Sequence, residues 1–142
     1  MGQQRSSLVA LAALYIASWI MLFLGTWDAL PRLDIPFHFF GGFFTARFFA
    51  AYVFKRKTPS GSIRQQWMIV ALAFGVGMAW ELYEYALTMW LGEYLAERDI
   101  TRCCIGTAFD TGKDLVMDTL GAIIAVRISL RSFTKIHPAK IA

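Results

Sequence analysis

The chain has 142 residues, of which 57% are hydrophobic and 17% are charged, and its formal net charge is +4. This composition leaves too little polar surface for a soluble domain, and the length is too short for two domains. We therefore expect one membrane domain over residues 1–142. The basic residues gather at the ends of the hydrophobic stretches and form no stripe on one face, which argues against nucleic-acid binding.

The first hydrophobic stretch follows Arg5 and predicts a membrane span over about residues 8–26. It is longer than the apolar core of an ordinary signal peptide, and no small-residue cleavage motif follows it. We therefore expect it to remain as an uncleaved span. In the polar turn over residues 27–36, Asp34 is placed to cap the next helix, and Pro36 suits the first turn of that helix.

The second span is predicted over about residues 35–54 and is rich in phenylalanine. Its Gly41-Gly42 pair would let a neighbouring helix approach closely. Arg47 lies inside this span, where its long side chain can extend toward the membrane surface. The basic run Lys55–Lys57 ends the span, and a loop follows.

The third span is predicted over about residues 67–91, with Trp67 and Trp90 near its ends as interfacial anchors. Gly75 and Gly77 offer a second close helix contact. The fourth span is predicted over about residues 109–130. The fold class expected is therefore all-α, a polytopic four-helix transmembrane bundle.

Two adjacent cysteines precede the fourth span, at Cys103 and Cys104. A disulfide between sequence neighbours is strained, and no Cys-x-x-Cys pair is present to bind zinc. We expect two free thiols, with a vicinal redox pair or an intermolecular bridge as the alternatives.

Lysine and arginine counts predict the orientation of the four spans. One side of the membrane receives Arg5, Lys55, Arg56, Lys57, Arg64, Arg127, Arg131, Lys135 and Lys140, and the other receives Arg32, Arg98, Arg102 and Lys113. The more basic side is expected to be cytoplasmic. Both termini are thus predicted to be cytoplasmic in a multi-pass protein of the bacterial inner membrane.

Six ionisable side chains occupy positions where hydrocarbon would be expected. They are His38, Glu81, Glu84, Asp110, Asp114 and Asp118. A charge at the centre of a spanning helix costs roughly 2.5–3.5 kcal/mol by insertion scales, so a small protein that keeps several such groups is expected to use them. On the predicted topology all six lie in the outer half of the bundle.

The spacing of these acids places them on shared helix faces. Glu81 and Glu84 are three residues apart, and Asp110, Asp114 and Asp118 follow one another at intervals of four. Polar faces of membrane helices turn toward the bundle interior or a water-filled cavity. Three helices are therefore expected to direct carboxylates and one imidazole at the same interior volume.

Carboxylates at such close range remain ionised only when a cation neutralises them. An oxygen-rich site with one imidazole suits Mg²⁺, Mn²⁺, Ca²⁺ or Zn²⁺. We assign Glu81 and Asp114 as catalytic candidates, and His38, Glu84, Asp118 and Asp110 as metal-ligand candidates. Asp110 has helix capping as its alternative role. Lys113 could neutralise one acid or contact an anionic substrate. The sequence contains no organic-cofactor fingerprint.

Three segments in this order resemble the YjdF-like group of small bacterial membrane proteins, a group that looks like a distant relative of the VanZ-like proteins. The segments are Asp34-Ile-Pro-Phe-His38-Phe, Glu81-Leu-Tyr-Glu84-Tyr, and Asp110 with Asp114-Leu-Val-Met-Asp118-Thr-Leu-Gly121. The resemblance covers roughly residues 33–124.

The chain departs from both patterns at several positions. YjdF-like proteins usually carry lysine, glycine and tryptophan where this chain has Ile35, Phe37 and Tyr85. VanZ-like proteins, which are associated with glycopeptide resistance and the cell envelope, tend to carry glutamine and asparagine at Glu84 and Asp118. The resemblance implies a shared membrane site and no particular reaction.

Three functions fit these observations. The first is a metal-dependent enzyme that acts on a lipid or lipid-linked envelope substrate near the outer leaflet. The second is a small proton or cation carrier, for which a homo-oligomer could supply the rest of the path. The third is a structural or accessory membrane protein with a buried polar network. Membrane lipids are the expected partners in each case, and nucleic acid is not.

Overall fold

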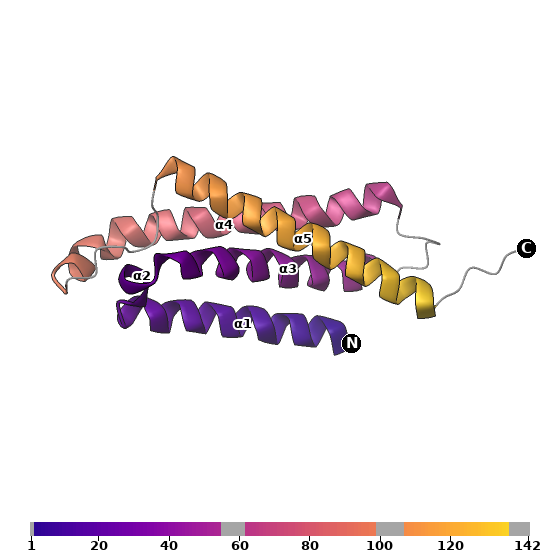
Figure 1. Ribbon diagram of the computed structural model, residues 1–142, viewed down its shortest axis with the longest axis horizontal. Helices are drawn as coiled ribbons and strands as arrows, with labels where there is room; N and C mark the ends of the chain where they lie inside the picture. The colour runs from indigo at the N-terminus through magenta and orange to yellow at the C-terminus, as the bar shows by residue number, and fades with distance from the viewer. Residues whose placement is uncertain (1, 55–61, 99–106, 137–142) are drawn as a thin grey trace, which may run out of the picture.

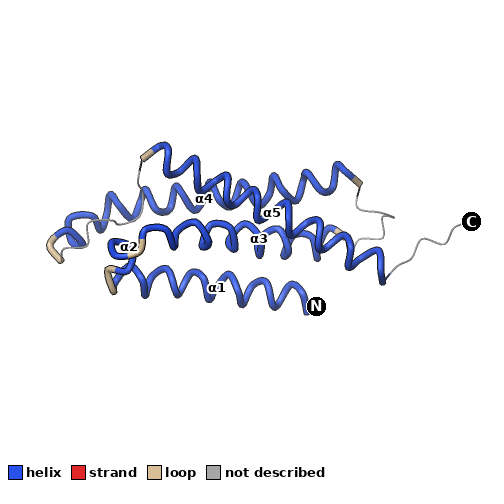
Figure 2. Tube along the Cα trace, viewed as in Figure 1, coloured by secondary structure: helices blue, strands red, loops and turns tan. Residues whose placement is uncertain are grey.

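The computed structural model describes residues 2–54, 62–98 and 107–136, and this part of the chain is helical with short turns (Figure 2). The helices are α1 (Gly2–Phe23), the short α2 (Thr26–Ala29), the 3-10 turn η1 (Pro31–Leu33), α3 (Asp34–Val53), α4 (Ile63–Ala96) and α5 (Ala108–Ile136). The expected all-α fold class is therefore confirmed for the described residues.

The four long helices form an elongated bundle in which α5 crosses the others obliquely (Figure 1). Helix α3 is central, because it packs against α1, α4 and α5, and its longest interface is with α5. The start of α1, the end of α3, the start of α4 and the end of α5 lie at one end of the bundle. We call this end the basic end, because Arg5, Arg64, Arg127 and Arg131 belong to it.

The end of α1 and both ends of α4 differ from the predicted spans. Helix α1 ends at Phe23 instead of residue 26, because Gly25 adopts a left-handed conformation with φ of 64° that breaks the helix. Helix α4 begins at Ile63 because Ser62 and Gln65 form a capping box. It continues to Ala96, five residues beyond the predicted end of the third span.

The two predicted aspartate caps are wrong. Asp34 is the first residue of α3, and its side chain makes no capping hydrogen bond. The cap of α5 is Thr107, whose hydroxyl oxygen accepts a hydrogen bond of 3.3 Å from the backbone N–H of Asp110. Both aspartate carboxylates are directed elsewhere, to basic side chains described below.

Close packing of α3 against α5 depends on two glycines. A Cβ atom at Gly42 would collide with the backbone carbonyl of Asp118, and a Cβ atom at Gly121 would collide with the carbonyl of Phe39. The contact predicted from Gly41-Gly42 is therefore present and is made chiefly by Gly42. The contact predicted at Gly75 is wrong, because nothing lies within 4 Å of a Cβ built there.

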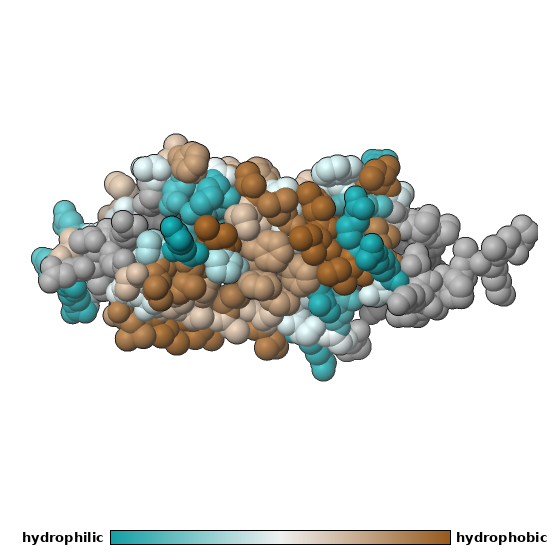
Figure 3. Space-filling model, in the orientation of Figure 1, coloured by the Kyte–Doolittle hydropathy of each residue, from teal (hydrophilic) through white to brown (hydrophobic). Residues whose placement is uncertain are grey.

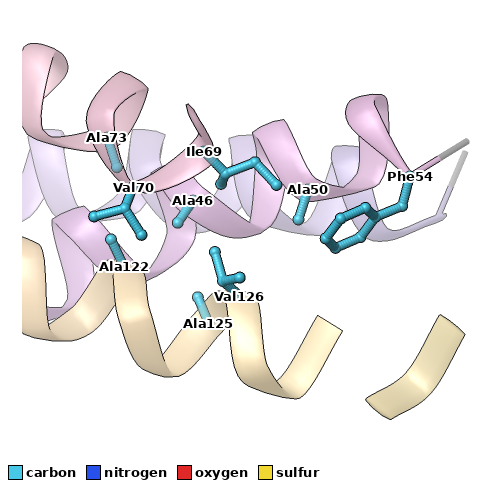
Figure 4. Packing of buried hydrophobic residues seen from close by; sticks show 9 residues of the cluster. All are labelled: Ala46, Ala50, Phe54, Ile69, Val70, Ala73, Ala122, Ala125 and Val126. Carbon is cyan, nitrogen blue, oxygen red and sulfur yellow. The ribbon is translucent and has the colours of Figure 1, made fainter. Parts of the chain in front are cut away.

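The hydrophobic core lies between α3, α4 and α5, in the half of the bundle nearer the basic end (Figure 4). Small side chains dominate it, which lets the three helices approach closely. Its buried members are Ala46, Ala50, Phe54, Ile69, Val70, Ala73, Ala122, Ala125 and Val126. The other half of the bundle interior is left for polar side chains.

The outer surface of the described helices is strongly apolar. Large hydrophobic side chains are exposed along α1, α4 and α5, and the tryptophans expected as anchors, Trp67 and Trp90, are 59% and 82% exposed. On the face shown in Figure 3, hydrophobic residues occupy the middle and hydrophilic residues gather toward the two ends. This distribution is that of a protein solvated by lipid.

Among the described helices, α1 and α4 are long and apolar enough to cross a membrane by length and composition. The second and fourth predicted spans do not meet this criterion, because α3 carries His38 and Arg47 and the first turns of α5 carry several acids. The basic run Lys55–Lys57, the Cys103–Cys104 pair and the tail from residue 137 lie outside the described residues.

Candidate functional site

His38 lies at the centre of a buried polar cluster, one turn into α3. Its Nε2 atom is 3.3 Å from Asp34 Oδ1 and 3.9 Å from Glu81 Oε1. Its Nδ1 atom is 3.3 Å from Asp118 Oδ2, within hydrogen-bonding geometry. One imidazole therefore joins α3, α4 and α5, with a carboxylate facing each ring nitrogen.

The position of Asp118 depends on the absence of a side chain on the facing helix. A Cβ atom at Gly77 of α4 would collide with the Asp118 carboxylate. With glycine at that position, the carboxylate lies between α3 and α4 and reaches His38. The close helix contact predicted at Gly77 is thus present, and the absence of a side chain at this position also leaves room for the Asp118 carboxylate.

Lys113 forms ion pairs with three acids of the cluster. Its Nζ atom lies 2.7 Å from Asp110 Oδ1, 3.2 Å from Asp34 Oδ2 and 3.2 Å from Asp114 Oδ1. The side chain of Asp110 is 41% exposed, so this residue lies at the rim of the cluster and pairs with Lys113. The neutralising role expected of Lys113 matches this placement.

Two groups of side chains have ligand atoms close enough to share one metal ion. The first group is Asp34, His38 and Asp114, and the second is His38, Glu81 and Glu84, with the atoms of each group within 4.8 Å of one another. Glu84 also accepts a hydrogen bond of 2.8 Å from the indole Nε1–H of Trp80. His38 belongs to both groups.

Two carboxylate oxygens in these groups are buried without a hydrogen-bond partner among the described residues. They are Glu81 Oε1 and Asp114 Oδ1, and the two residues are only 5% and 4% exposed. Lys113 is near Asp114 Oδ1 as an ion pair, outside hydrogen-bonding geometry. An unsatisfied buried acceptor costs about 1–3 kcal/mol and more when it is charged. The donor set of each group fits a hard divalent cation: an ion in the first group would coordinate Asp114, and an ion in the second group would coordinate Glu81.

The structure brings together five of the six residues singled out in the sequence, namely His38, Glu81, Glu84, Asp114 and Asp118. Asp110 and Asp118 lie outside both ligand groups, but Asp118 contacts His38 Nδ1, whereas Asp110 pairs with Lys113 at the rim. The catalytic and metal-binding roles assigned to these residues stay predictions. Asp34 was missed as a site residue, although its spacing of four residues from His38 within one helix was a usable signal.

A cavity of about 440 Å³ lies beside the cluster, between α1, α3 and α4. Asp34, His38, Glu84, Asp110 and Asp118 contribute to its wall. The remaining wall is largely apolar or aromatic. Its size lies within the roughly 300–1,000 Å³ typical of small-molecule sites. The cluster is thus accessible to a ligand that enters the bundle.

Comparison with known proteins gives one match. The family model described as "Predicted membrane protein (DUF2238)" matches residues 4–135. This match is consistent with the YjdF-like resemblance, and no finding supports the distant relation to VanZ-like proteins. No curated protein and no solved structure matches the chain. Because the match covers almost the whole chain, the protein belongs to this family of predicted membrane proteins.

Proposed function

We propose that the protein crosses the bacterial inner membrane four times, with α1, α3, α4 and α5 as its spans. The polar residues that lower the hydropathy of α3 and α5 include His38, Asp114 and Asp118, which are buried inside the bundle. Buried polar groups of this kind are compatible with a lipid-facing apolar surface. The positive-inside rule then makes the basic end, and both termini, cytoplasmic.

Thiol labelling tests this topology. In a background with Cys103 and Cys104 replaced by serine, Glu97→Cys at the end of α4 is expected to react with a membrane-impermeant maleimide on intact cells. Arg64→Cys at the start of α4 is expected to react only after the membrane is opened. Both positions are exposed in the structure. Equal labelling of the two variants on intact cells would contradict the orientation.

We further propose that the cluster around His38 binds a divalent cation. The observation that supports this is the pair of buried acceptors, Glu81 Oε1 and Asp114 Oδ1, whose residues each share a candidate ligand group with His38. Glu81 Oε1 lies 3.9 Å from His38 Nε2. Asp118, on the Nδ1 side, can orient the imidazole by accepting its N–H, as carboxylates do behind metal-bound histidines. Mg²⁺, Mn²⁺, Ca²⁺ and Zn²⁺ all suit such a donor set.

The function that fits this arrangement best is a metal-dependent enzyme acting on a lipid or lipid-linked envelope substrate. A bound cation would polarise a substrate oxygen or lower the pKa of a water molecule. Glu81 and Asp114 are the candidates for accepting a proton, because they are buried and belong to different ligand groups, so an ion in one group leaves the acid of the other free to accept the proton. The adjacent cavity would admit the substrate from the membrane.

Lipid turnover tests this function. The protein is reconstituted in liposomes of a bacterial lipid extract with Mn²⁺ or Mg²⁺, and the lipids are followed by mass spectrometry. A metal-dependent change in one lipid class is expected, and Glu81→Gln should slow it by at least about 100-fold, the usual scale for loss of an acid–base group. Glu93→Gln, an exposed change on the same helix, serves as the control. A lipid profile that is identical with and without metal would contradict an enzymatic role on these lipids.

A structural or accessory role is the second candidate, and the ion pairs of the cluster favour it. Lys113 and His38 already neutralise several of the acids, so the cluster can hold α3, α4 and α5 together without a metal. In that case Lys113→Met should lower the melting temperature of the protein whether or not divalent ions are present. A melting temperature of the unmodified protein that rises with Mn²⁺ would instead favour the metal site.

A further inference from the structure

The cavity has an aromatic wall contributed by α1 and α4. Tyr15 lies edge-on to Trp80, with ring centroids 6.0 Å apart, and its hydroxyl is 3.3 Å from the hydroxyl of Tyr83. Trp19 packs against Tyr15 at 6.5 Å, and Trp80 against Tyr83 at 5.4 Å. All four side chains line the cavity. Aromatic faces grouped in this way attract organic cations as well as hydrocarbon.

Glu84 joins this aromatic wall to the polar cluster. It lines the cavity, and its carboxylate accepts the indole N–H of Trp80, the residue one turn earlier in α4. The hydrogen bond holds a carboxylate next to the aromatic group. A carboxylate combined with aromatic rings is the usual composition of sites that bind amines and quaternary ammonium groups.

The charges on the cavity wall favour a cationic ligand. Among the described residues, no lysine or arginine lines the cavity, whereas four acids do. Three of these acids have basic neighbours: Asp34 and Asp110 contact Lys113, and Asp118 contacts His38. Glu84 makes its hydrogen bond with the neutral indole of Trp80, and His38 lies within 4.8 Å of it.

The part of the cavity farther from Glu84 is largely apolar, with Thr45 as a polar member of its lining. Leu11 and Leu14 of α1 and Ala73 and Val76 of α4 line it. Val76 precedes Glu84 by two helical turns, a separation of about 12 Å along the helix at 1.5 Å per residue. One end of the cavity therefore combines an acid with aromatic rings, and the other end is largely apolar. This arrangement matches an amphiphile that has one polar head and one apolar chain.

From this arrangement we propose that the cavity binds an amphiphilic cation, a molecule with one hydrocarbon chain and an amine or quaternary ammonium head. The head lies between Glu84 and the aromatic group of Tyr15, Trp19, Trp80 and Tyr83, and the chain extends toward Val76. An amine-bearing membrane lipid and a free long-chain amine share this chemistry. Glu84 also belongs to the second candidate metal group, so binding of the amphiphile is tested with metal removed, where it does not depend on the proposed enzyme.

The test uses the whole protein in dodecyl maltoside micelles with EDTA present. Dodecyltrimethylammonium is titrated while the tryptophan fluorescence is recorded, because Trp19, Trp27 and Trp80 line the cavity. Saturable binding is expected. Glu84→Gln is expected to weaken it about tenfold, the effect of losing a charge-assisted contact of about 1.4 kcal/mol. Glu93→Gln controls for general attraction of cations to a negatively charged protein.

Three results would overturn the proposal. The first is that dodecanoate, which carries the opposite charge on a similar chain, binds as tightly as dodecyltrimethylammonium. The second is that Glu84→Gln leaves the affinity for dodecyltrimethylammonium unchanged, and the third is that tetramethylammonium, which has no chain, binds as tightly. Competition with lysophosphatidylethanolamine, which has one acyl chain, distinguishes an amine-bearing lipid from a free amine, because this lipid displaces the probe only if the site accepts the lipid. Displacement of the probe by a free long-chain amine, but not by the lipid, would identify the free amine as the ligand.

A second variant keeps the proposal testable if Glu84→Gln fails to fold. Val76 is 45% exposed and lines the apolar end, so Val76→Phe should be tolerated while shortening the space for the chain. The affinity of this variant for dodecyltrimethylammonium is then expected to fall relative to its affinity for the shorter octyltrimethylammonium. An unchanged preference between the two chain lengths would show that the chain does not occupy this cavity.

Discussion

Gly42→Leu protein is expected to lose its compact fold, because the new side chain would have to occupy the space of the Asp118 backbone. Overpacking of a protein interior typically costs 1–3 kcal/mol, and we expect a loss on the order of 3 kcal/mol or more here, because the obstacle is backbone. The measurement is size-exclusion chromatography in detergent together with thermal unfolding. Aggregated protein or a much lower melting temperature is the expected result.

Gly75→Leu is the matched control for this experiment. It introduces the same residue into α4 at a position where nothing lies within 4 Å of a Cβ atom. Leucine is also a better helix former than glycine, by about 0.8 kcal/mol on propensity scales. This variant should therefore be at least as stable as the unmodified protein. Equal stability of the two variants would contradict the close approach of α3 and α5.

His38→Ala is expected to lower the affinity for Mn²⁺ by more than about 100-fold, since His38 belongs to both groups of candidate ligands. Asp118→Asn should lower it by a smaller factor, about 10–100-fold, because Asp118 would act through the orientation of the imidazole. Mn²⁺ affinity is measured by electron paramagnetic resonance of the free ion. Glu93→Gln should leave it unchanged.

The same titration has a predicted pH dependence. A metal ion binds the neutral imidazole, so binding to Nε2 must release any proton held between His38 and Asp34. The affinity should therefore rise as the pH is raised. An affinity that is independent of pH, or that is the same in His38→Ala as in the unmodified protein, would exclude His38 as a ligand.

The sequence predicted the cluster well because helical spacing determines which side chains share a face. Glu81 and Glu84 on α4, and Asp114 and Asp118 on α5, reach one volume, as expected from intervals of three and four residues. Asp34 was assigned to a cap because aspartate is a frequent cap. Its partner His38 lies four residues later in the same helix, whereas its partner Lys113 became evident only when α5 was placed against the start of α3.

Sequence patterns did not predict the cavity. It exists because α1 packs against α3 while only side chains such as Tyr15 and Tyr83 connect it to α4. The relative placement of helices is a tertiary property, and hydrophobic periodicity does not determine it. For the same reason the sequence did not separate the glycine that makes a close contact, Gly77, from Gly75, which makes none.

The hydrophobic core and the polar cluster lie toward opposite ends of the bundle and meet at the cavity. The core alanines Ala46, Ala50, Ala122 and Ala125 do not line the cavity, whereas Ala73 does. The polar cluster contains buried acids whose acceptors are incompletely satisfied. Proteins commonly retain such unfavourable polar groups where a ligand satisfies them.

The central claim, a divalent-cation site in the His38 cluster, is tested most directly by elemental analysis of the protein purified without chelator. This protein is compared with His38→Ala and Glu93→Gln prepared in parallel. We predict about one divalent metal ion per chain in the unmodified protein and in Glu93→Gln, and almost none in His38→Ala. Folded, metal-free unmodified protein that also fails to bind added Mg²⁺, Mn²⁺, Ca²⁺ or Zn²⁺ would contradict the claim.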